Sequence, residues 1–312
     1  MKQFTVLAGL VTVLAAPTTN AVNIDWVTVG DPGNACDSQP QGCFGSVADA
    51  YRISKYEVTN SQYAEFLNAV AAANLHGLYN PTMNSGPAGG ITQGGSLGSY
   101  FYNPIAGREN MPVNNVSFYD TLRFANWLHN GQPTGPADFT TTEDGAYLLL
   151  ATSPGARKPG AQVFVPNDDE WYKAAYFNGT SYFDYPAGSD TPITCAAPGA
   201  TPNTANCLGG VGDLSNVGSY TNSASSYGTF DQGGNVREWN ETILGLNRVL
   251  RGGHFLDSAG TLAASERLDG TPLFESYLTG FRVASIPEPS SALLLGLGLT
   301  GLAGKGRRRN RS

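Results

Sequence analysis

The sequence predicts a single α+β domain that is rich in loops and poor in long regular elements. Its 39 glycines and 19 prolines, in 312 residues, place many turns along the chain. Apolar residues recur at helical spacing in a few segments only, between short stretches that alternate like strands. Residues 22–285 contain no internal repeat and no Pro/Ser linker, so they fit one domain. This pattern favours a loop-rich α+β fold over a parallel α/β sheet.

The first predicted elements are a strand and the helix that follows it. Residues 51–58 alternate inward and outward side chains like a half-buried strand. Thr59 then begins a helix, and Gln62 three residues later completes a capping box. The apolar face of this helix is formed by residues at helical spacing: Tyr63, Phe66, Leu67 and Val70.

Two further helices are predicted from their N-terminal caps. Ser117 begins the second, which follows an extended segment from Met111. Residues 163–166 form a short strand, and Asn167 caps a third helix over 168–176, whose acidic first turn suits the helix dipole. Beyond residue 178 we expect mainly turns and short strands. The second helix takes its apolar contacts from Leu122, Phe124, Ala125, Trp127 and Leu128.

Residues 74–110, rich in Gly, Asn, Ser and Tyr, are expected to form an ordered excursion over the surface. Exposed tyrosines and asparagines in residues 79–103 would suit stacking and hydrogen bonding with a sugar or a peptide. A solvated loop without a ligand has the same composition, so the sequence leaves both interpretations open.

Residues 1–21 are typical of a cleavable secretory signal peptide. Lys2 precedes an apolar run from Phe4 to Ala16, and the small residues Thr19 and Ala21 suit the −3 and −1 positions of a cleavage site. An N-terminal membrane anchor is the alternative, but it would need roughly 20 apolar residues. The run ends too early for that.

Residues 286–312 form a tripartite tail. Pro287-Glu288-Pro289 precedes an apolar run over 290–304, and the chain closes on a basic cluster. This pattern resembles the PEP-CTERM sorting signal, in which the apolar segment enters the inner membrane transiently and the basic end stays cytoplasmic. The resemblance implies an exosortase-type processing enzyme and export to the envelope of a Gram-negative bacterium. An ordinary C-terminal anchor is the alternative, although about 15 apolar and small residues are short for a span.

The region between these ends is strongly acidic. Residues 22–285 keep 12 of the 18 basic residues and 24 of the 25 acidic ones, a balance of −12. Binding to nucleic acid or to an anionic membrane surface depends on Lys and Arg. We therefore expect no nucleic-acid partner, and we regard divalent cations as the more suitable ligands.

The 4 cysteines of this exported chain predict disulfides. They lie as two close pairs in the sequence. Among the three possible connectivities we favour Cys36 with Cys43 and Cys195 with Cys207, each of which closes a short polar loop. Neither spacing suits a structural zinc site, whose ligand pairs usually have about two to four residues between them.

Six sequence blocks in register resemble the formylglycine-generating enzyme, or sulfatase-modifying factor, family. The resemblance covers about residues 24–284 and implies a compact α+β domain, distantly like the C-type lectin fold. The blocks are Glu57-Val58-Thr59-Asn60, residues 111–128, residues 166–175, Gly234-Asn235-Val236-Arg237-Glu238-Trp239, Arg251-Gly252-Gly253 and Gly280-Phe281-Arg282.

The resemblance also identifies what is missing. In the oxidases of the family, a cysteine pair shortly after the Arg-Gly-Gly turn holds copper and activates oxygen to convert a sulfatase cysteine to formylglycine. Asp257 and Leu262 stand at those two positions here. Because monovalent copper requires soft thiolates, we expect neither copper binding nor formylglycine formation. Arg237 also replaces the aromatic residue that is usual before Glu238.

An enzyme with a changed active site is the alternative, and it would centre on His254, which directly follows Arg251-Gly252-Gly253. A partly buried histidine that only forms hydrogen bonds is the competing interpretation. His76 and His129 lie in separate motifs, so a three-histidine metal centre is not expected. The residues of the changed site would be His254, Asp257, Ser258 and Glu266.

A calcium site is predicted at the glycine turn over residues 231–238. Calcium takes roughly six to eight oxygen ligands from carboxylates and backbone carbonyls, and family members bind it at the positions of Asp231, Gly234, Val236 and Glu238. In the alternative, Asp231 accepts backbone N–H bonds and Glu238 pairs with an arginine. Asn206 with Asp213 is a second, weaker calcium candidate.

Together these observations predict an exported protein of the outer cell surface or the extracellular matrix. Its domain would serve ligand binding or architecture, with an extracellular polysaccharide or another envelope protein as its partner. The alternative is an oxidoreductase or other enzyme of the same family with a changed active site.

Overall fold

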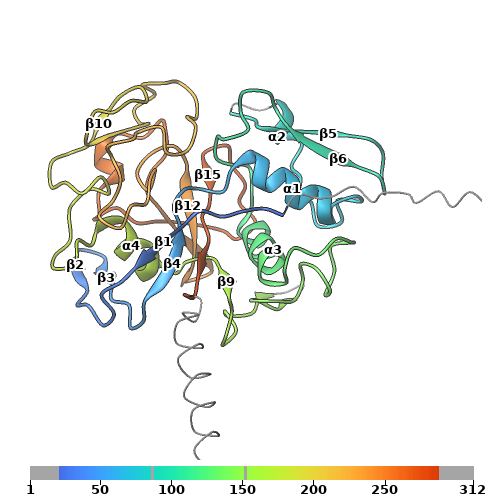
Figure 1. The fold of residues 1–312 in the computed structure, drawn as a ribbon, viewed down its shortest axis with the longest axis horizontal. Coiled ribbons are helices and arrows are strands. Elements are labelled where there is room, and N and C mark those ends of the chain that lie inside the picture. Colours follow the sequence, from blue (N-terminus) through green and yellow to red (C-terminus); the bar gives the residue numbers. More distant parts are fainter. Residues whose placement is uncertain (1–20, 86–87, 151–152, 288–312) are drawn as a thin grey trace, which may run out of the picture.

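Two four-stranded sheets form the centre of the fold (Figure 1). The first has the strand order β1-β4-β16-β9, and all its neighbours are antiparallel. Because β4 pairs with both β1 and β16, this sheet joins the beginning of the described domain to its end. Its strands are β1 (Trp26–Val29), β4 (Tyr51–Ser54), β16 (Ala284–Ser285) and β9 (Val163–Phe164).

The second sheet has the order β14-β13-β12-β15 and carries the glycine turns of the C-terminal half. β12 and β13 form an antiparallel hairpin, whereas β15 runs parallel to β12. The pairing places Glu238 opposite both Arg251 and Gly280. The strands are β12 (Arg237–Leu244), β13 (Asn247–Arg251), β14 (Leu268–Gly270) and β15 (Thr279–Gly280).

The computed structural model describes residues 21–85, 88–150 and 153–287. The predicted signal peptide, apart from Ala21, and the tail from residue 288 onward lie outside the described residues. Within those ranges, no helix has the length and apolar character that crossing a bilayer requires.

The three predicted helices are present, and each begins at the predicted cap. They are α1 (Asn60–Val70), α3 (Phe118–His129) and α4 (Asp168–Tyr176), capped by Thr59, Ser117 and Asn167. In each case the cap side chain accepts the N3 backbone N–H, and the N3 side chain returns to the cap, which satisfies two otherwise free donors. The local chain chemistry therefore determines where these helices start.

Aromatic side chains from α1 and α3 form the centre of the main core. The rings of Phe66 and Phe124 lie 5.4 Å apart, edge to face, and Phe124 meets Phe281 at 5.3 Å in the same geometry. Tyr63 and Trp127 complete this group, and all five side chains are buried. Edge-to-face pairs are favoured by the ring quadrupole, so helix packing here is specific as well as apolar.

Short paired elements fill the rest of the molecule, which confirms the prediction of a loop-rich α+β domain. In Figure 1 the excursion with α2, β5 and β6 lies beside α1, and the segment with β10 lies on the side of α4. The remaining elements are β2 (Asp37–Gln39), β3 (Gly42–Phe44), α2 (Thr82–Ser85), β5 (Ile91–Gly94), β6 (Phe101–Pro104), β7 (Leu149–Leu150), β8 (Ser153–Pro154), β10 (Thr194–Cys195), β11 (Thr204–Ala205) and the 3₁₀ helix η1 (Ala259–Leu262).

Both predicted disulfides are confirmed. Cys36 is bonded to Cys43 and Cys195 to Cys207, which leaves no free cysteine. The first bridge closes the β2–β3 hairpin, and the second lies at the parallel pair of β10 and β11. Each bridge therefore staples a short loop that has little regular structure of its own.

Three details differ from the sequence prediction. The strand predicted over 51–58 ends at Ser54; Lys55 still donates its N–H to Asp25 O beside β1, and Glu57 is buried rather than facing solvent. The longest strand, β12, lies beyond residue 178, where only short strands were expected. Tyr79 and Tyr102 are buried, so they cannot provide the exposed stacking surface expected in residues 79–103.

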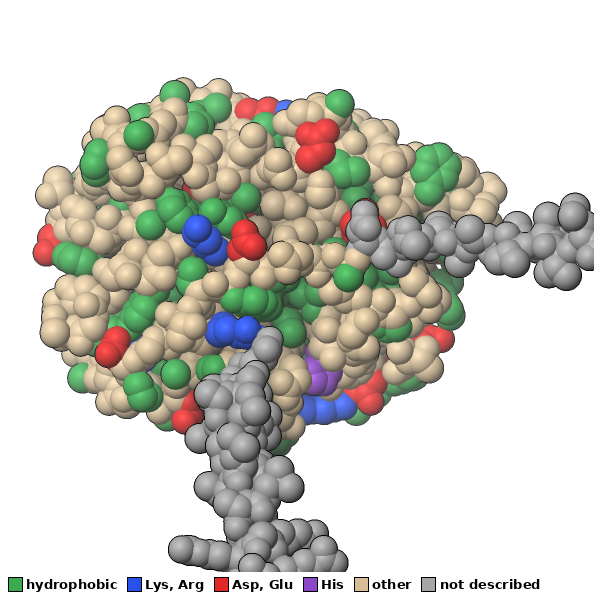
Figure 2. Space-filling model, viewed as in Figure 1, with side chains coloured by type: hydrophobic (Ala, Val, Ile, Leu, Met, Phe, Trp, Pro, Cys, Tyr) green, Lys and Arg blue, Asp and Glu red, His purple; other side chains and the backbone are tan. Residues whose placement is uncertain are grey.

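The surface carries few charges for its area. Figure 2 shows isolated acidic and basic side chains on this face, separated by polar and apolar atoms, with no continuous basic patch. This arrangement agrees with the acidic balance of the sequence, and this face offers no basic surface that could bind the phosphate backbone of a nucleic acid.

Candidate functional site

The Gly252-Gly253 turn at the end of β13 forms one wall of the candidate site. Both residues have positive φ, +93° and +66°, which favours glycine. A side chain at Gly253 would begin 2.8 Å from Leu262 Cδ1 and 3.4 Å from Asp257 Oδ2. Leu262 and Asp257, the two residues expected at the positions of the family's cysteines, therefore both lie against this turn.

Leu262 is fully buried at the end of η1. It packs in an apolar cluster with Ile193, Ala205 and Cys207, and the disulfide partner Cys195 lies at the edge of the same cluster. This position is dry and hydrocarbon-lined, so it has no group that could donate electrons to a metal.

Asp257 is held by a cation. Arg237 Nη2 lies 2.5 Å from Asp257 Oδ2, and the backbone N–H of His254 donates to the same oxygen at 3.0 Å. Arg237 and Asp257 are two of the three residues expected from the sequence to differ from the family pattern, with Leu262 the third. The opposite charges of Arg237 and Asp257 neutralise each other in an ion pair.

His254 and Asp257 are the only two of the four proposed enzyme residues that come together. His254 is 8% exposed, and its Nε2 lies 3.5 Å from Asp257 Oδ2. Burial lowers the pKa of His254, which favours the neutral ring, and its Nδ1 accepts the N–H of Leu256 at 3.2 Å. Ser258 and Glu266 are exposed, and Ser258 Oγ lies near Thr261 rather than the histidine.

Glu238 forms the centre of a buried polar cluster behind the turn. Its carboxylate receives two bonds from Arg282, at 2.6 Å and 2.7 Å, and a third from Trp171 Nε1 at 2.7 Å. Both members of the ion pair are fully buried. Arg251 is likewise paired, with Asp168 at 2.7 Å, and it donates to the carbonyls of Ala264 and Glu266. Arg251 and Arg282 therefore both stabilise the structure around the turn.

The comparison with known proteins identifies this scaffold. A family model for the sulfatase-modifying factor enzyme 1-like domain matches residues 32–286. The chain belongs to this family. A second model, for the PEP-CTERM protein-sorting motif, matches residues 285–309. That tail indicates export to the cell envelope of a Gram-negative bacterium and processing by an exosortase.

Solved structures with the sulfatase-modifying-factor fold resemble the whole described domain. Treponema denticola variable protein 1 is 19% identical, with a TM-score of 0.54, over 86% of this chain and 98% of that one. The crystal structure of CarF is also 19% identical, with a TM-score of 0.50, over 85% and 99%. At these identities the likeness concerns the fold alone. No curated protein matches the chain.

At the 231–238 turn, two of the predicted calcium ligands, Asp231 and Glu238, already accept hydrogen bonds from protein donors. All three donors on Glu238 come from Arg282 and Trp171, so its oxygens are already satisfied and a cation stands beside them. Asp231 Oδ2 accepts the N–H of Gly218 at 2.6 Å. This is the arrangement of the alternative interpretation. Among the described residues, no group of three or more His, Cys, Asp or Glu side chains is placed to hold a metal ion.

The Asn206 and Asp213 candidate has one feature that fits a cation. Asn206 Oδ1 is buried and has no hydrogen-bond donor, while Asn206 Nδ2 donates to the Asp213 carbonyl at 2.9 Å. An unsatisfied buried carbonyl oxygen is a ligand that calcium can use. The Asp213 carboxylate itself pairs with Arg108. The two calcium candidates are neighbours, because the N–H of Asn235 donates to Asn206 O at 3.0 Å.

Glu57 is a site residue that sequence reasoning missed. It is 1% exposed, and it accepts the side-chain N–H of Asn235 at 2.9 Å. Burial raises its pKa well above the ordinary value, and the charges of Asp231 and Glu238 raise it further. The alternation of residues 51–58 gives no sign of this, since burial of Glu57 depends on Asn235, far away in the sequence.

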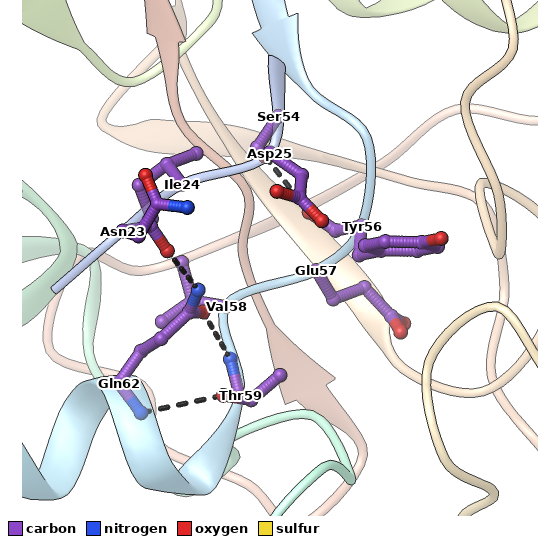
Figure 3. A pocket seen from close by; sticks show the side chains of 9 residues that line it. All are labelled: Asn23, Ile24, Asp25, Ser54, Tyr56, Glu57, Val58, Thr59 and Gln62. Atoms are coloured by element: carbon purple, nitrogen blue, oxygen red, sulfur yellow. Dashed lines mark hydrogen bonds between the residues drawn. The ribbon is translucent and has the colours of Figure 1, made fainter. Parts of the chain in front are cut away.

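A pocket of about 200 Å³ lies beside Glu57 (Figure 3). It separates the N-terminal segment at Asn23 and Asp25 from the start of α1. Gln62 closes one end, where its Nε2 donates to Asn23 O at 2.9 Å. Figure 3 shows the Glu57 side chain directed away from Gln62, toward the interior. Glu57 therefore lines this pocket, while its carboxylate accepts a hydrogen bond from Asn235.

The buried carboxyl of Asp231 predicts an unusual pH dependence. Burial raises the pKa of Asp231 from 3.8 to about 6, so the ionised form destabilises the folded state. This cost is absent below the unfolded pKa and fully present above the folded one. The free energy of unfolding of Asp231→Asn should therefore rise relative to that of the native protein as the pH increases from 4 to 8, by roughly 3 kcal/mol in total.

Denaturant unfolding of both proteins across that range measures the difference. Asp184→Asn, at an exposed carboxyl, is the matched control and should follow the native curve. Parallel curves for the native protein and Asp231→Asn would contradict the raised pKa.

Proposed function

We propose that this exported domain serves ligand binding or architecture at the outer surface or in the extracellular matrix, and that it does not form formylglycine. The observation that supports the proposal is the chemistry at Gly253. A buried leucine and an arginine-paired carboxylate stand where the family's oxidases have two thiolates, and all 4 cysteines are in disulfides. Monovalent copper requires soft ligands, which neither group supplies.

The alternative is an enzyme with a changed active site. The contact of His254 with Asp257 favours it, because a carboxylate can orient an imidazole. Against it stands the lack of a nucleophile: Ser258 is exposed and does not bond to His254, and nucleophilic catalysis needs that pair within hydrogen-bond reach. Asp257 is also already neutralised by Arg237.

The copper argument is tested with the protein incubated with Cu(I), oxygen and a sulfatase-motif peptide. We expect no retained copper after desalting and no aldehyde by mass spectrometry, because no thiolate pair is present. The double variant Asp257→Cys, Leu262→Cys restores the missing ligands and serves as the comparison for copper retention. Stoichiometric copper with aldehyde formation by the native protein would overturn the proposal.

A polar groove is the best surface for such a ligand. It has a volume of about 460 Å³ and is lined by Asp31, Asn34, Thr180 and Tyr182, among others. Its walls are rigid: Tyr182 Oη donates to Ala35 O at 2.8 Å, and Asn34 Nδ2 donates to Gly45 O at 2.8 Å. An aromatic ring next to amide and carboxylate groups suits the apolar face and hydroxyls of a sugar.

The acidic balance of residues 22–285 indicates which charge a polysaccharide ligand of this groove should carry. A balance of −12 repels polyanions, so a neutral or amino polysaccharide is favoured over an acidic one. Cellohexaose and chitosan oligomers are defined probes of these two classes.

Filling the groove should abolish binding. Thr180→Trp places a large side chain at the exposed rim, and we expect affinity for the bound oligomer to fall at least about tenfold in calorimetry. Thr140→Trp is the matched control, because Thr140 and Thr180 occupy equivalent exposed turns, each bonded to the Asp or Asn two residues earlier.

Two results would count against the groove. One is the absence of binding by the native protein to either oligomer or to matrix polysaccharide from a Gram-negative biofilm. The other is equal loss of binding in both tryptophan variants.

Calcium at Asn206 remains part of the proposal. Added calcium should raise the thermal midpoint of the native protein by mass action, and Asn206→Ala should remove this response. Asp231→Asn, at the other candidate, should keep it. A response that disappears in Asp231→Asn but survives in Asn206→Ala, or no response at all, would refute calcium binding at Asn206.

A further inference from the structure

Arg248 is a buried arginine without a hydrogen-bonding partner. It lies on β13 and is 8% exposed. Its Nε is buried and unpaired, and its guanidinium forms neither an ion pair nor a hydrogen bond with any residue that the structure describes. The guanidinium carbon lies 4.9 Å from the centroid of the Phe118 ring, in a cation–π contact.

The other buried arginines are all matched by carboxylates. Arg251 pairs with Asp168 at 2.7 Å and Arg282 with Glu238 at 2.6 Å. Arg157, which lies beside Arg248, forms ion pairs with Glu170 at 2.7 Å and Glu241 at 2.6 Å. Burying an unpaired charge costs free energy that pairing would offset. Arg251 Nη2 and Arg237 Nε are also buried without a hydrogen-bond partner, but both of these arginines form an ion pair with a carboxylate, whereas Arg248 forms none within the described part of the chain.

Arg248 lines a pocket of about 130 Å³. Phe118, Leu122 and Ile243 give the pocket apolar walls. The polar side chains in the lining are already occupied, since Tyr147 Oη donates to Glu241 at 2.6 Å and Arg157 is saturated by its two glutamates. Arg248 is thus the lining side chain with free donors.

We propose that this pocket binds one carboxylate group carried on a small apolar substituent. The planar guanidinium of Arg248 presents parallel N–H groups that match the two oxygens of a carboxylate. The apolar walls take the carbon part of the ligand. A volume of about 130 Å³ is well above the roughly 10–15 Å³ that one water molecule needs on the same measure, so a carboxylate with a short branched chain can enter.

Local charge favours a carboxylate over a phosphate. Arg157 and Arg248 are balanced by Glu170 and Glu241, so the pocket region is neutral before the ligand enters. A singly charged anion can use the free donors of Arg248, whereas a dianion would also meet repulsion from Glu241. The ligand could be a free small acid or the C-terminal carboxylate of a chain that ends in an apolar residue.

This inference is independent of the polysaccharide groove. The two sites share no lining residue, and the carboxylate pocket can be occupied whether or not the domain binds a polymer.

The test uses the purified full-length protein and calorimetry with two pairs of probes. Isovalerate is compared with isovaleramide, and the peptide Gly-Gly-Leu with its C-terminal amide. We expect saturable binding of at least one carboxylate and none of its amide. Binding of isovalerate identifies a free small acid as the source, and preference for the peptide identifies a chain end.

Arg248→Met should weaken carboxylate binding at least about tenfold and should not lower the thermal midpoint, because it removes an unpaired buried charge. A purely structural Arg248 would show the opposite effect on the midpoint. Arg248→Lys, which keeps the charge without the planar fork, should also bind more weakly. Arg108→Met, which alters a partly exposed ion pair elsewhere, is the control and should bind like the native protein.

The proposal fails if the native protein binds neither carboxylate saturably, if the amides bind equally well, or if Arg248→Met and Arg248→Lys retain full affinity.

Discussion

The buried ion pair between Glu238 and Arg282 is the interaction on which the rest of the domain depends. Glu238 belongs to β12, and Trp171 of α4 donates to the same carboxylate. Arg282 also donates to Ser54 O, at the end of β4, and to Phe230 O. One guanidinium thus joins both sheets and the loop before the glycine turn. Removing either partner would leave a buried charge uncompensated, which is far more costly than the pair is stabilising.

The same pair explains the electrostatics of the site. Burial raises the pKa of both Glu57 and Asp231, the neighbouring carboxylates raise it further, and Arg282, which already pairs with Glu238, offsets only part of this rise. Arg282 donates two hydrogen bonds to Glu238, so a calcium ion at the predicted 231–238 site would have to share this carboxylate with the arginine.

At the neighbouring turn, the residues expected to differ from the family pattern are each accommodated by a neighbour. A lone aspartate in a thiolate position would be a poorly matched charge, but Arg237 neutralises it, and Leu262 joins an apolar cluster beside a disulfide. The space beside the turn is therefore filled by an ion pair and an apolar side chain. The PEP-CTERM tail indicates export, and the proposed binding or architectural role is compatible with both observations.

The sequence by itself determined the features that depend on neighbouring residues. Helix starts at Thr59, Ser117 and Asn167, both disulfides and the family followed from caps, spacing and motifs, because each of these is decided within a few residues. Only the tertiary structure decided which charged side chains form ion pairs or hydrogen bonds with one another. The burial of Glu57 and the isolation of Arg248 arise from segments far apart in the chain, and no local pattern records whether a charged side chain will find its partner there.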